Sequence, residues 1–305
     1  MAIDINAFGV CANSYAGTGL GSCPIEEFGD LKGLGAINKG ETLDIATGTM
    51  NEATFRSLIT SGKLHQLIDL EAFEQNTPDN EVYTSSNGLK RDLRSGKPEF
   101  TITYMKGLCS HKKMYNIQGN GKFDWYLYFE KGMLLAKNIA ETELKGFNGG
   151  MFSVGTYKFL QGGDPEQGKA MIQLRDTEEF NTQWVYFPYD VIGFDASQID
   201  GVIDTVVSVK TAPADTDTTF AVNVVDGCNS SVSYASLFDA VGDWSVLVNG
   251  ASVTISAVSV SGDDVALTIP VLSTGDIVKV SLNSVVEDDN GKYYKSNIAS
   301  TTVIA

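Results

Sequence analysis

Hydrophobic and polar positions alternate in short segments along the last third of the chain. Seven of these segments are rich in valine, isoleucine and threonine: TVVSVK, TTFAVNVV, WSVLVNG, ASVTISAVSVSG, DVALTIPV, DIVKVSLNSV and SNIASTTVIA. Turn-forming pairs such as Asp226-Gly227 and Asn249-Gly250 separate the segments. Alternation of this kind predicts strands with one buried face, and the turn residues predict that successive strands fold back on each other.

About seven strands in about 100 residues are typical of an immunoglobulin-like β-sandwich, which we predict for residues 205–305. The predicted core residues are Trp244, Val246, Val253, Ile255, Leu267, Ile269, Val278 and Val280. Residues 205–305 hold 4 Lys or Arg and 11 Asp or Glu, whereas residues 1–204 hold 18 and 27. This change in composition predicts two domains, 1–204 and 205–305.

The pattern in residues 1–204 is mixed, and we expect an α+β domain in which β-structure dominates. Residues 49–62 predict a short helix: Asn51 or Thr49 caps it, an apolar stripe shares one face, and Gly62 ends it. The apolar stripe consists of Phe55, Leu58 and Ile59. The segment LCSHKKMYNIQ is either a second helix or an irregular turn. Most of the remaining apolar segments are β-rich and predict strands.

The aromatic segment FDWYLYF, residues 123–129, predicts a strand with large side chains on both faces. Phe123, Trp125 and Leu127 lie on one face of such a strand, and Tyr126 and Tyr128 lie on the other. Two interpretations are open: a strand buried on both sides, or a stacking platform for a ligand such as a sugar. We favour burial on both sides.

One segment departs from the acidic character of the protein, whose formal net charge is −16. Residues 87–97 hold four basic residues and one acid, and we expect a long loop there, between a strand that ends near Thr84 and one that begins near Phe100. Such a charge asymmetry within one domain suits contact between copies, because complementary charge fixes register and partner choice. The predicted inter-subunit contact residues are Tyr83, Lys90, Arg91, Arg94 and Lys97. A solvated basic loop without a partner is the alternative.

The chain has none of the common catalytic or phosphate-binding motifs, and we expect no enzymatic activity and no cofactor. The four cysteines, Cys11, Cys23, Cys109 and Cys228, and the two histidines, His65 and His111, do not have the spacing of a metal site. We expect reduced, buried thiols, with a Cys11–Cys23 disulfide as the alternative in a secreted protein.

Adjacent acids such as Glu178-Glu179 are expected to be solvated loop charges, because neighbouring carboxylates on a strand point to opposite faces. We expect a plain turn at Asp288-Asp289-Asn290-Gly291 in preference to a calcium site. The N-terminal residues have no basic region followed by an apolar run, and no apolar run approaches the length of a membrane span. We therefore expect a chain made in a cytoplasm, with no membrane partner. Because the protein is acidic, we also expect no sequence-specific nucleic-acid partner.

The segments EVYTSSNGLKRDLRSGKPEFTITYM and GGMFSVGTYKFLQGGDPEQGKAMIQLRD, with a helix among the strands, resemble the tail tube proteins of tailed phages. The ending VVEDDNGKYYKSNIASTTVIA resembles the last strands of bacterial immunoglobulin-like domains, which some tail tube proteins carry at the C-terminus. The first resemblance implies a β-sandwich or barrel-like tube domain with one or two short helices. Members of that family form hexameric rings that stack into a tube, and a long loop within a β-hairpin reaches a neighbouring subunit.

The resemblance therefore implies a structural protein of the virion, with other copies of itself and other virion proteins as partners. Two alternatives remain open at this stage. One is a capsid auxiliary, decoration or head–tail connector protein with an immunoglobulin-like appendage. The other is a secreted adhesin or carbohydrate-binding module, against which the N-terminal sequence counts.

Overall fold

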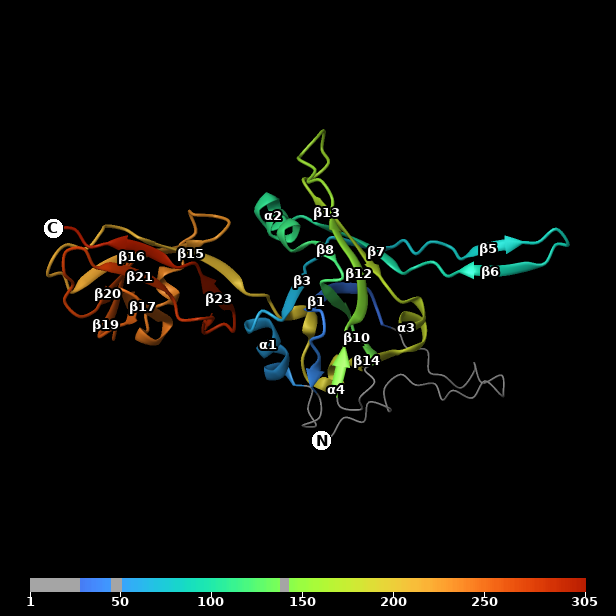
Figure 1. Cartoon of the computed structure of the whole chain (residues 1–305), viewed down its shortest axis with the longest axis horizontal. Helices are drawn as coiled ribbons and strands as arrows, with labels where there is room; N and C mark the ends of the chain where they lie inside the picture. Colours follow the sequence, from blue (N-terminus) through green and yellow to red (C-terminus); the bar gives the residue numbers. More distant parts are fainter. Residues whose placement is uncertain (1–27, 45–50, 138–142) are drawn as a thin grey trace. The chain divides into compact units, whose positions relative to one another are not determined.

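The structure is a computed structural model that describes residues 28–44, 51–137 and 143–305. The chain divides into two compact units, 1–200 and 201–305, close to the boundary that composition predicts. Figure 1 shows that strands dominate each unit, so the prediction of a mainly β protein is confirmed.

The first unit contains most of the strands of the chain. They are β1 (Leu31–Asn38), β2 (Leu43–Asp44), β3 (Leu64–Ile68), β4 (Ala72–Gln75), β5 (Glu81–Thr84), β6 (Lys90–Arg94), β7 (Glu99–Tyr104), β8 (Gly119–Asn120), β9 (Phe123–Phe129), β10 (Gly132–Lys137), β11 (Glu143–Lys145), β12 (Phe147–Val154), β13 (Gly168–Leu174) and β14 (Trp184–Pro188). Its helices are α1 (Glu52–Thr60), α2 (Gly107–Ile117), α3 (Thr177–Thr182), α4 (Tyr189–Ile192) and the 3-10 helix η3 (Ala196–Gln198).

Strand β12 links two groups of antiparallel strands in this unit. The hydrogen-bonded order is β2-β11-β10-β9-β12-β13-β7-β4, with β1, β3, β8 and β14 attached beside this path. Phe147 and Asn148 of β12 pair with β9, whereas its later residues pair with β13 and β8. A β-bulge between Gly149 and Met151 separates the two pairings, and such bulges bend a strand. A β-carbon at Gly149 would lie 2.1 Å from the carbonyl oxygen of Phe123, so this bend requires glycine.

The core of the unit is built around β9, and the preferred interpretation of the aromatic segment is confirmed. Six of the seven residues of β9 are buried. Trp125 and Leu127 pack into a cluster with Phe147, Phe152 and other apolar residues. On the opposite face, Tyr128 contacts Phe55 of α1, with the ring centroids 6.2 Å apart. A strand buried in this way offers no stacking platform to a ligand.

Helix α1 forms as its sequence predicts. The Asn51 side chain accepts a hydrogen bond of 2.8 Å from the backbone N–H of Thr54, which caps the helix. Phe55, Leu58 and Ile59 are its buried residues. The segment that the sequence left open between helix and turn is helix α2. The described residues thus form four short α-helices, where one or two were expected.

His111 of α2 has a structural role, as predicted. It is buried, and its Nδ1 lies 2.6 Å from the hydroxyl oxygen of Tyr104. Burial, and secondarily the nearby Tyr157, raise the pKa of Tyr104 to about 12. Cys109, on the same helix, is disulfide-bonded, and so is Cys228. The expectation of reduced thiols is therefore wrong for these two residues; Cys11 and Cys23 lie outside the described residues.

Glu179 corrects a second expectation, because this carboxylate is buried rather than solvated. It is only 5% exposed, it pairs with Lys145, and it accepts a hydrogen bond of 2.7 Å from the backbone N–H of Asn148. Asp124 on β9 is buried in the same region and pairs with Lys39 at 2.7 Å. A buried carboxylate requires such partners, because the charge has lost its hydration.

The second unit is a sandwich of two sheets. Its strands are β15 (Ile203–Val209), β16 (Thr219–Asp226), β17 (Trp244–Val248), β18 (Ala251–Ser252), β19 (Ala257–Ser261), β20 (Asp264–Thr268), β21 (Ile277–Leu282), β22 (Val286–Glu287), β23 (Tyr293–Ser296) and β24 (Ala299–Thr302), with 3-10 helices η4 (Ala235–Leu237) and η5 (Val241–Asp243). One sheet has the order β19-β20-β16-β15-β23-β22 and the other β18-β17-β21-β24. Strands β15 and β23 pair in parallel, which the sequence did not predict.

The predicted core of this sandwich is confirmed. Seven of the eight predicted residues are buried, and the eighth, Val253, is partly buried against the same cluster. The Trp244 indole donates a hydrogen bond of 3.0 Å to the carbonyl oxygen of Phe238. The segment from Asp288 to Gly291 is a turn, as predicted: the Asp288 carboxylate accepts hydrogen bonds from the backbone N–H groups of Asn290 and Lys292.

Candidate functional site: an exposed ribbon and the basic pocket at its base

The basic segment is a β-hairpin, not the long loop that its sequence predicts. Strands β5 and β6 pair with each other in a separate two-stranded sheet, called here the ribbon (residues 81–94). The expected strand ends near Thr84 and Phe100 are correct. The residues between them nevertheless contain strand β6, so the prediction of a continuous loop over residues 87–97 is wrong.

The ribbon is the outer end of one long hairpin. At its inner end, β4 pairs with β7, and Gln75 lies opposite Phe100. Further out, Glu81 lies opposite Arg94. Five residues separate these two pairs on each strand, 76–80 and 95–99, so the spacing is equal as far as Glu81. A β-bulge between Glu81 and Val82 then shifts the register of the ribbon by one residue, so that Val82 lies opposite Asp92. In Figure 1 the labels β5 and β6 mark a ribbon that extends beyond the sheet of its unit.

Polar residues close the tip of the ribbon. The backbone N–H of Ser85 donates to the carbonyl oxygen of Leu89 at 2.8 Å, and the N–H of Gly88 donates to the carbonyl oxygen of Ser85 at 2.9 Å. Gly88 has a φ of +83°, a conformation in which glycine is favoured. These residues fold the tip by local hydrogen bonds, as turn-forming sequences do.

The ribbon has no core of its own. Every residue of β5 and β6 is exposed to solvent. The exposed residues include large apolar side chains: Val82 (49% exposed), Tyr83 (52%), Leu89 (57%) and Leu93 (66%). An isolated two-stranded hairpin is at best marginally stable in water, and clustered exposed apolar residues mark interaction surfaces. The ribbon therefore has the features of a segment that is covered by a partner.

Four of the five predicted contact residues, Tyr83, Lys90, Arg91 and Arg94, lie on the ribbon. Arg94 forms an ion pair with Glu81, its cross-strand neighbour, at 3.2 Å, and both side chains are exposed. Neither Lys90 nor Arg91 has a carboxylate within 4.0 Å among the described residues. The ribbon thus presents basic and apolar side chains together.

The base of the ribbon is held by the body of the unit. The backbone N–H of Gly96 donates to the Asn80 side chain at 3.1 Å, and its carbonyl oxygen accepts a hydrogen bond of 3.0 Å from the Thr177 hydroxyl. A β-carbon at Gly96 would lie 1.7 Å from the carbonyl oxygen of Pro78. The two segments of the hairpin approach this closely only because residue 96 is glycine.

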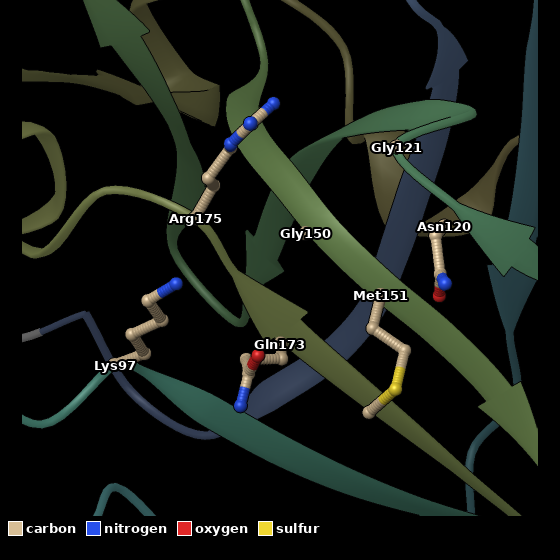
Figure 2. A pocket seen from close by; sticks show the side chains of 7 residues that line it. All are labelled: Lys97, Asn120, Gly121, Gly150, Met151, Gln173 and Arg175. Carbon is tan, nitrogen blue, oxygen red and sulfur yellow. The ribbon is translucent and has the colours of Figure 1, made fainter.

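The fifth predicted residue, Lys97, lies in a pocket at the base of the ribbon (Figure 2). The pocket has a volume of about 420 Å³. Its lining residues are Lys97, Asn120, Gly121, Gly150, Met151, Gln173 and Arg175. Sequence reasoning did not find Arg175, because no local pattern links the residue after β13 to the segment before β7.

The described residues contain neither a metal-ion site nor a membrane-spanning helix. No group of three or more His, Cys, Asp or Glu side chains is arranged to hold a metal ion there. No helix in that part of the chain is long and apolar enough to cross a membrane.

Comparison with known proteins does not identify a family. No family model and no curated protein sequence matches the chain. One solved structure that it matches is SGBP-B of the Bacteroides ovatus mixed-linkage glucan utilization locus, in complex with a mixed-linkage heptasaccharide, at 11% identity and a TM-score of 0.20. The match covers 76% of this chain and 59% of that one. A likeness at this level supports no statement about fold or function.

Proposed function

We propose that the protein is a non-enzymatic structural protein of a virion that assembles with copies of itself, as rings that stack into a tail tube. The observation that carries the proposal is the ribbon, which joins exposed apolar residues to two basic residues, Lys90 and Arg91, that have no carboxylate within 4.0 Å among the described residues. A segment of this kind gains stability when a second molecule covers it. The sequence resemblance to tail tube proteins supplies the particular form of the assembly.

Charge supports a second copy as the partner of the ribbon. Residues 86–122 hold eight Lys or Arg and two Asp or Glu, whereas the whole chain has a net charge of −16. The ribbon of one copy would therefore meet a predominantly acidic surface on the next. Each exposed ion pair contributes only about 0–1 kcal/mol, but the same contact repeats in every subunit of a ring. A ring needs such a contact between two different surfaces of the subunit.

The ribbon also fits a capsid auxiliary or head–tail connector protein, in which the assembly takes another shape. The test of the proposal is therefore made in two steps. Negative-stain microscopy of the purified full chain shows whether it forms stacked rings, other particles or monomers. Stacked rings or tubes are the expected result, and a monomer at high protein concentration and low salt would contradict self-assembly.

The second step asks whether the ribbon makes the contact. K90E/R91E reverses the two ribbon charges that lack a partner and leaves the Arg94–Glu81 pair intact. The matched control is K32E/K169E, which reverses two exposed lysines outside the ribbon and outside the basic segment 86–122. We expect K90E/R91E to weaken assembly strongly with little change in subunit melting, and raised salt to act in the same direction. Equal assembly of the two variants at low salt would exclude a role for ribbon charge.

A further inference from the structure

Two cations line the pocket at the base of the ribbon. Lys97 and Arg175 both line it, and neither has a carboxylate within 4.0 Å among the described residues. Five other lysines of the same unit form ion pairs: Lys39, Lys63, Lys106, Lys145 and Lys158. Lys97 and Arg175 are exposed and, like Lys90 and Arg91 of the ribbon, lack such a pair among the described residues. What distinguishes Lys97 and Arg175 is that both line one pocket.

The carboxylates nearest to these cations in the sequence are already engaged. The Glu99 carboxylate accepts a hydrogen bond of 3.3 Å from the Gln173 amide. The Asp176 carboxylate caps helix α3, where it accepts hydrogen bonds from the backbone N–H groups of Glu178 (3.0 Å) and Glu179 (3.2 Å). None of the described residues that line the pocket is acidic. The described residues therefore leave the positive charge of the pocket without a carboxylate partner.

The remaining lining residues leave room for a ligand. Gly150 is the extra residue of the bulge in β12, and Gly121 sits in a turn with a φ of +62°. Neither residue has a side chain to fill the space. Asn120 and Gln173 bring amide groups to the same pocket, as Figure 2 shows. Arginine offers a planar set of donors that matches two oxygens of a carboxylate or phosphate, and lysine adds a point charge.

We propose that this pocket binds an oxyanion, a carboxylate or a phosphate, between Lys97 and Arg175. Two sources would supply such an oxyanion. One is an acidic side chain of a second copy of this chain, and this source rests on the proposed function. The other is a small anion from solution, which does not depend on assembly.

Calorimetric titration of the full chain with inorganic phosphate at low ionic strength tests the site. The test variant is K97Q/R175Q, and the matched control is K32Q/K112Q, which removes two exposed charges elsewhere. We expect saturable binding by the parent and the control, and a loss of about tenfold or more in K97Q/R175Q, because charge-assisted hydrogen bonds are lost. Chloride at the same ionic strength gives the baseline. No saturable binding by the parent, or an equal loss in both variants, would overturn the proposal.

Assembly in the presence of saturating phosphate separates the two sources. If phosphate competes with assembly, and K97Q/R175Q weakens assembly where K32Q/K112Q does not, the ligand is a carboxylate of a second copy. If assembly is unchanged while phosphate still binds, the ligand is a small anion. A protein that does not assemble at all would contradict the proposed function and leave the result of the phosphate titration standing.

Discussion

Strand β9 and the ribbon are both β-structure in the same unit, yet different interactions hold them. Six of the seven residues of β9 are buried, and it packs on both faces. Every residue of β5 and β6 is exposed. The first strand is stabilised by apolar burial within the subunit. Among the described residues, the ribbon has only its own backbone pairing, the exposed Arg94–Glu81 ion pair, a few turn hydrogen bonds and the anchors at its base, so its apolar side chains contribute little until something covers them.

Strand β9 and the ribbon are therefore suited to different tasks. Removing a side chain from β9 should destabilise the subunit, whereas removing one from the ribbon should leave its stability nearly unchanged and change what it binds. Mutations that separate these two readouts can therefore support or refute the division between scaffold and contact surface.

The largest expected effect is that of Trp125→Ala in β9. Trp125 is 1% exposed and packs among the rings of Phe123 and Phe152. Truncation of a buried aromatic residue leaves a cavity and should lower the free energy of unfolding by about 3–5 kcal/mol. Chemical denaturation of the full chain measures this loss in the unfolding transition of the first unit. The control is Leu93→Ala on the ribbon, which should stay within about 0.5 kcal/mol of the parent. Similar losses in both variants would refute the comparison.

The next effect concerns the apolar side chains of the ribbon. Leu89→Ser with Leu93→Ser keeps every ribbon charge and removes its two most exposed large apolar residues. Burial of a leucine contributes about 1.5–3 kcal/mol, so the double variant should weaken assembly by an amount that salt does not reproduce. Sedimentation velocity at two salt concentrations measures this. Val271→Ser, at a residue that is 63% exposed in the second unit, serves as the control. Unchanged assembly of the double variant would leave charge as the only contribution of the ribbon.

Several parts of the fold could be predicted because their causes are local. Helix α1 has its cap at Asn51 and its apolar stripe within one segment, and both are in place. The sandwich core follows from the alternation of residues such as Val278 and Val280, which are buried as predicted. Strand β9 could be placed because five of its seven residues are aromatic. In each case the evidence lies within about ten residues of chain.

The parts that could not be predicted depend on contacts between distant segments. Strand β6 was expected to be loop, because its pairing with β5 extends a hairpin whose inner end is the pairing of β4 with β7, outside the segment. Glu179 was expected in solvent, but Lys145 and the backbone of Asn148 surround it in the fold. Arg175 reaches the pocket of Lys97 only because β13 pairs with β7. No pattern within a single segment indicates any of these arrangements.

A smaller effect is expected at the base of the ribbon, from Gly96→Ala. The added β-carbon would lie 1.7 Å from the Pro78 carbonyl oxygen, so the two segments of the hairpin must move apart. Overpacking of this kind typically costs about 1–3 kcal/mol. Because the base joins the ribbon to the sheet, we expect a displaced ribbon and weaker assembly, with the core around β9 intact. Hydrogen exchange should show faster exchange at residues 76–98 and none of that change in β9. Gly242→Ala, where a β-carbon would meet nothing within 4 Å and where, as at Gly96, φ is not positive, controls for the loss of a glycine. Slow exchange at the base, as in the parent, would show that the hairpin tolerates the change.

The smallest effect is expected from Glu81→Gln, which removes the only ion pair found among the described ribbon residues. Arg94 and Glu81 lie 3.2 Å apart, and their side chains are 78% and 60% exposed. Such a pair contributes about 0–1 kcal/mol, so the melting of the subunit should not change measurably. The substitution also frees Arg94 and adds one unit of positive charge to the ribbon. If the ribbon meets an acidic surface, assembly at low salt should therefore be equal to or tighter than that of the parent, and the difference should vanish at high salt. Weaker assembly would mean that the Arg94–Glu81 pair holds the ribbon in its binding shape, and that the ribbon, like β9, owes its structure to contacts within its own subunit.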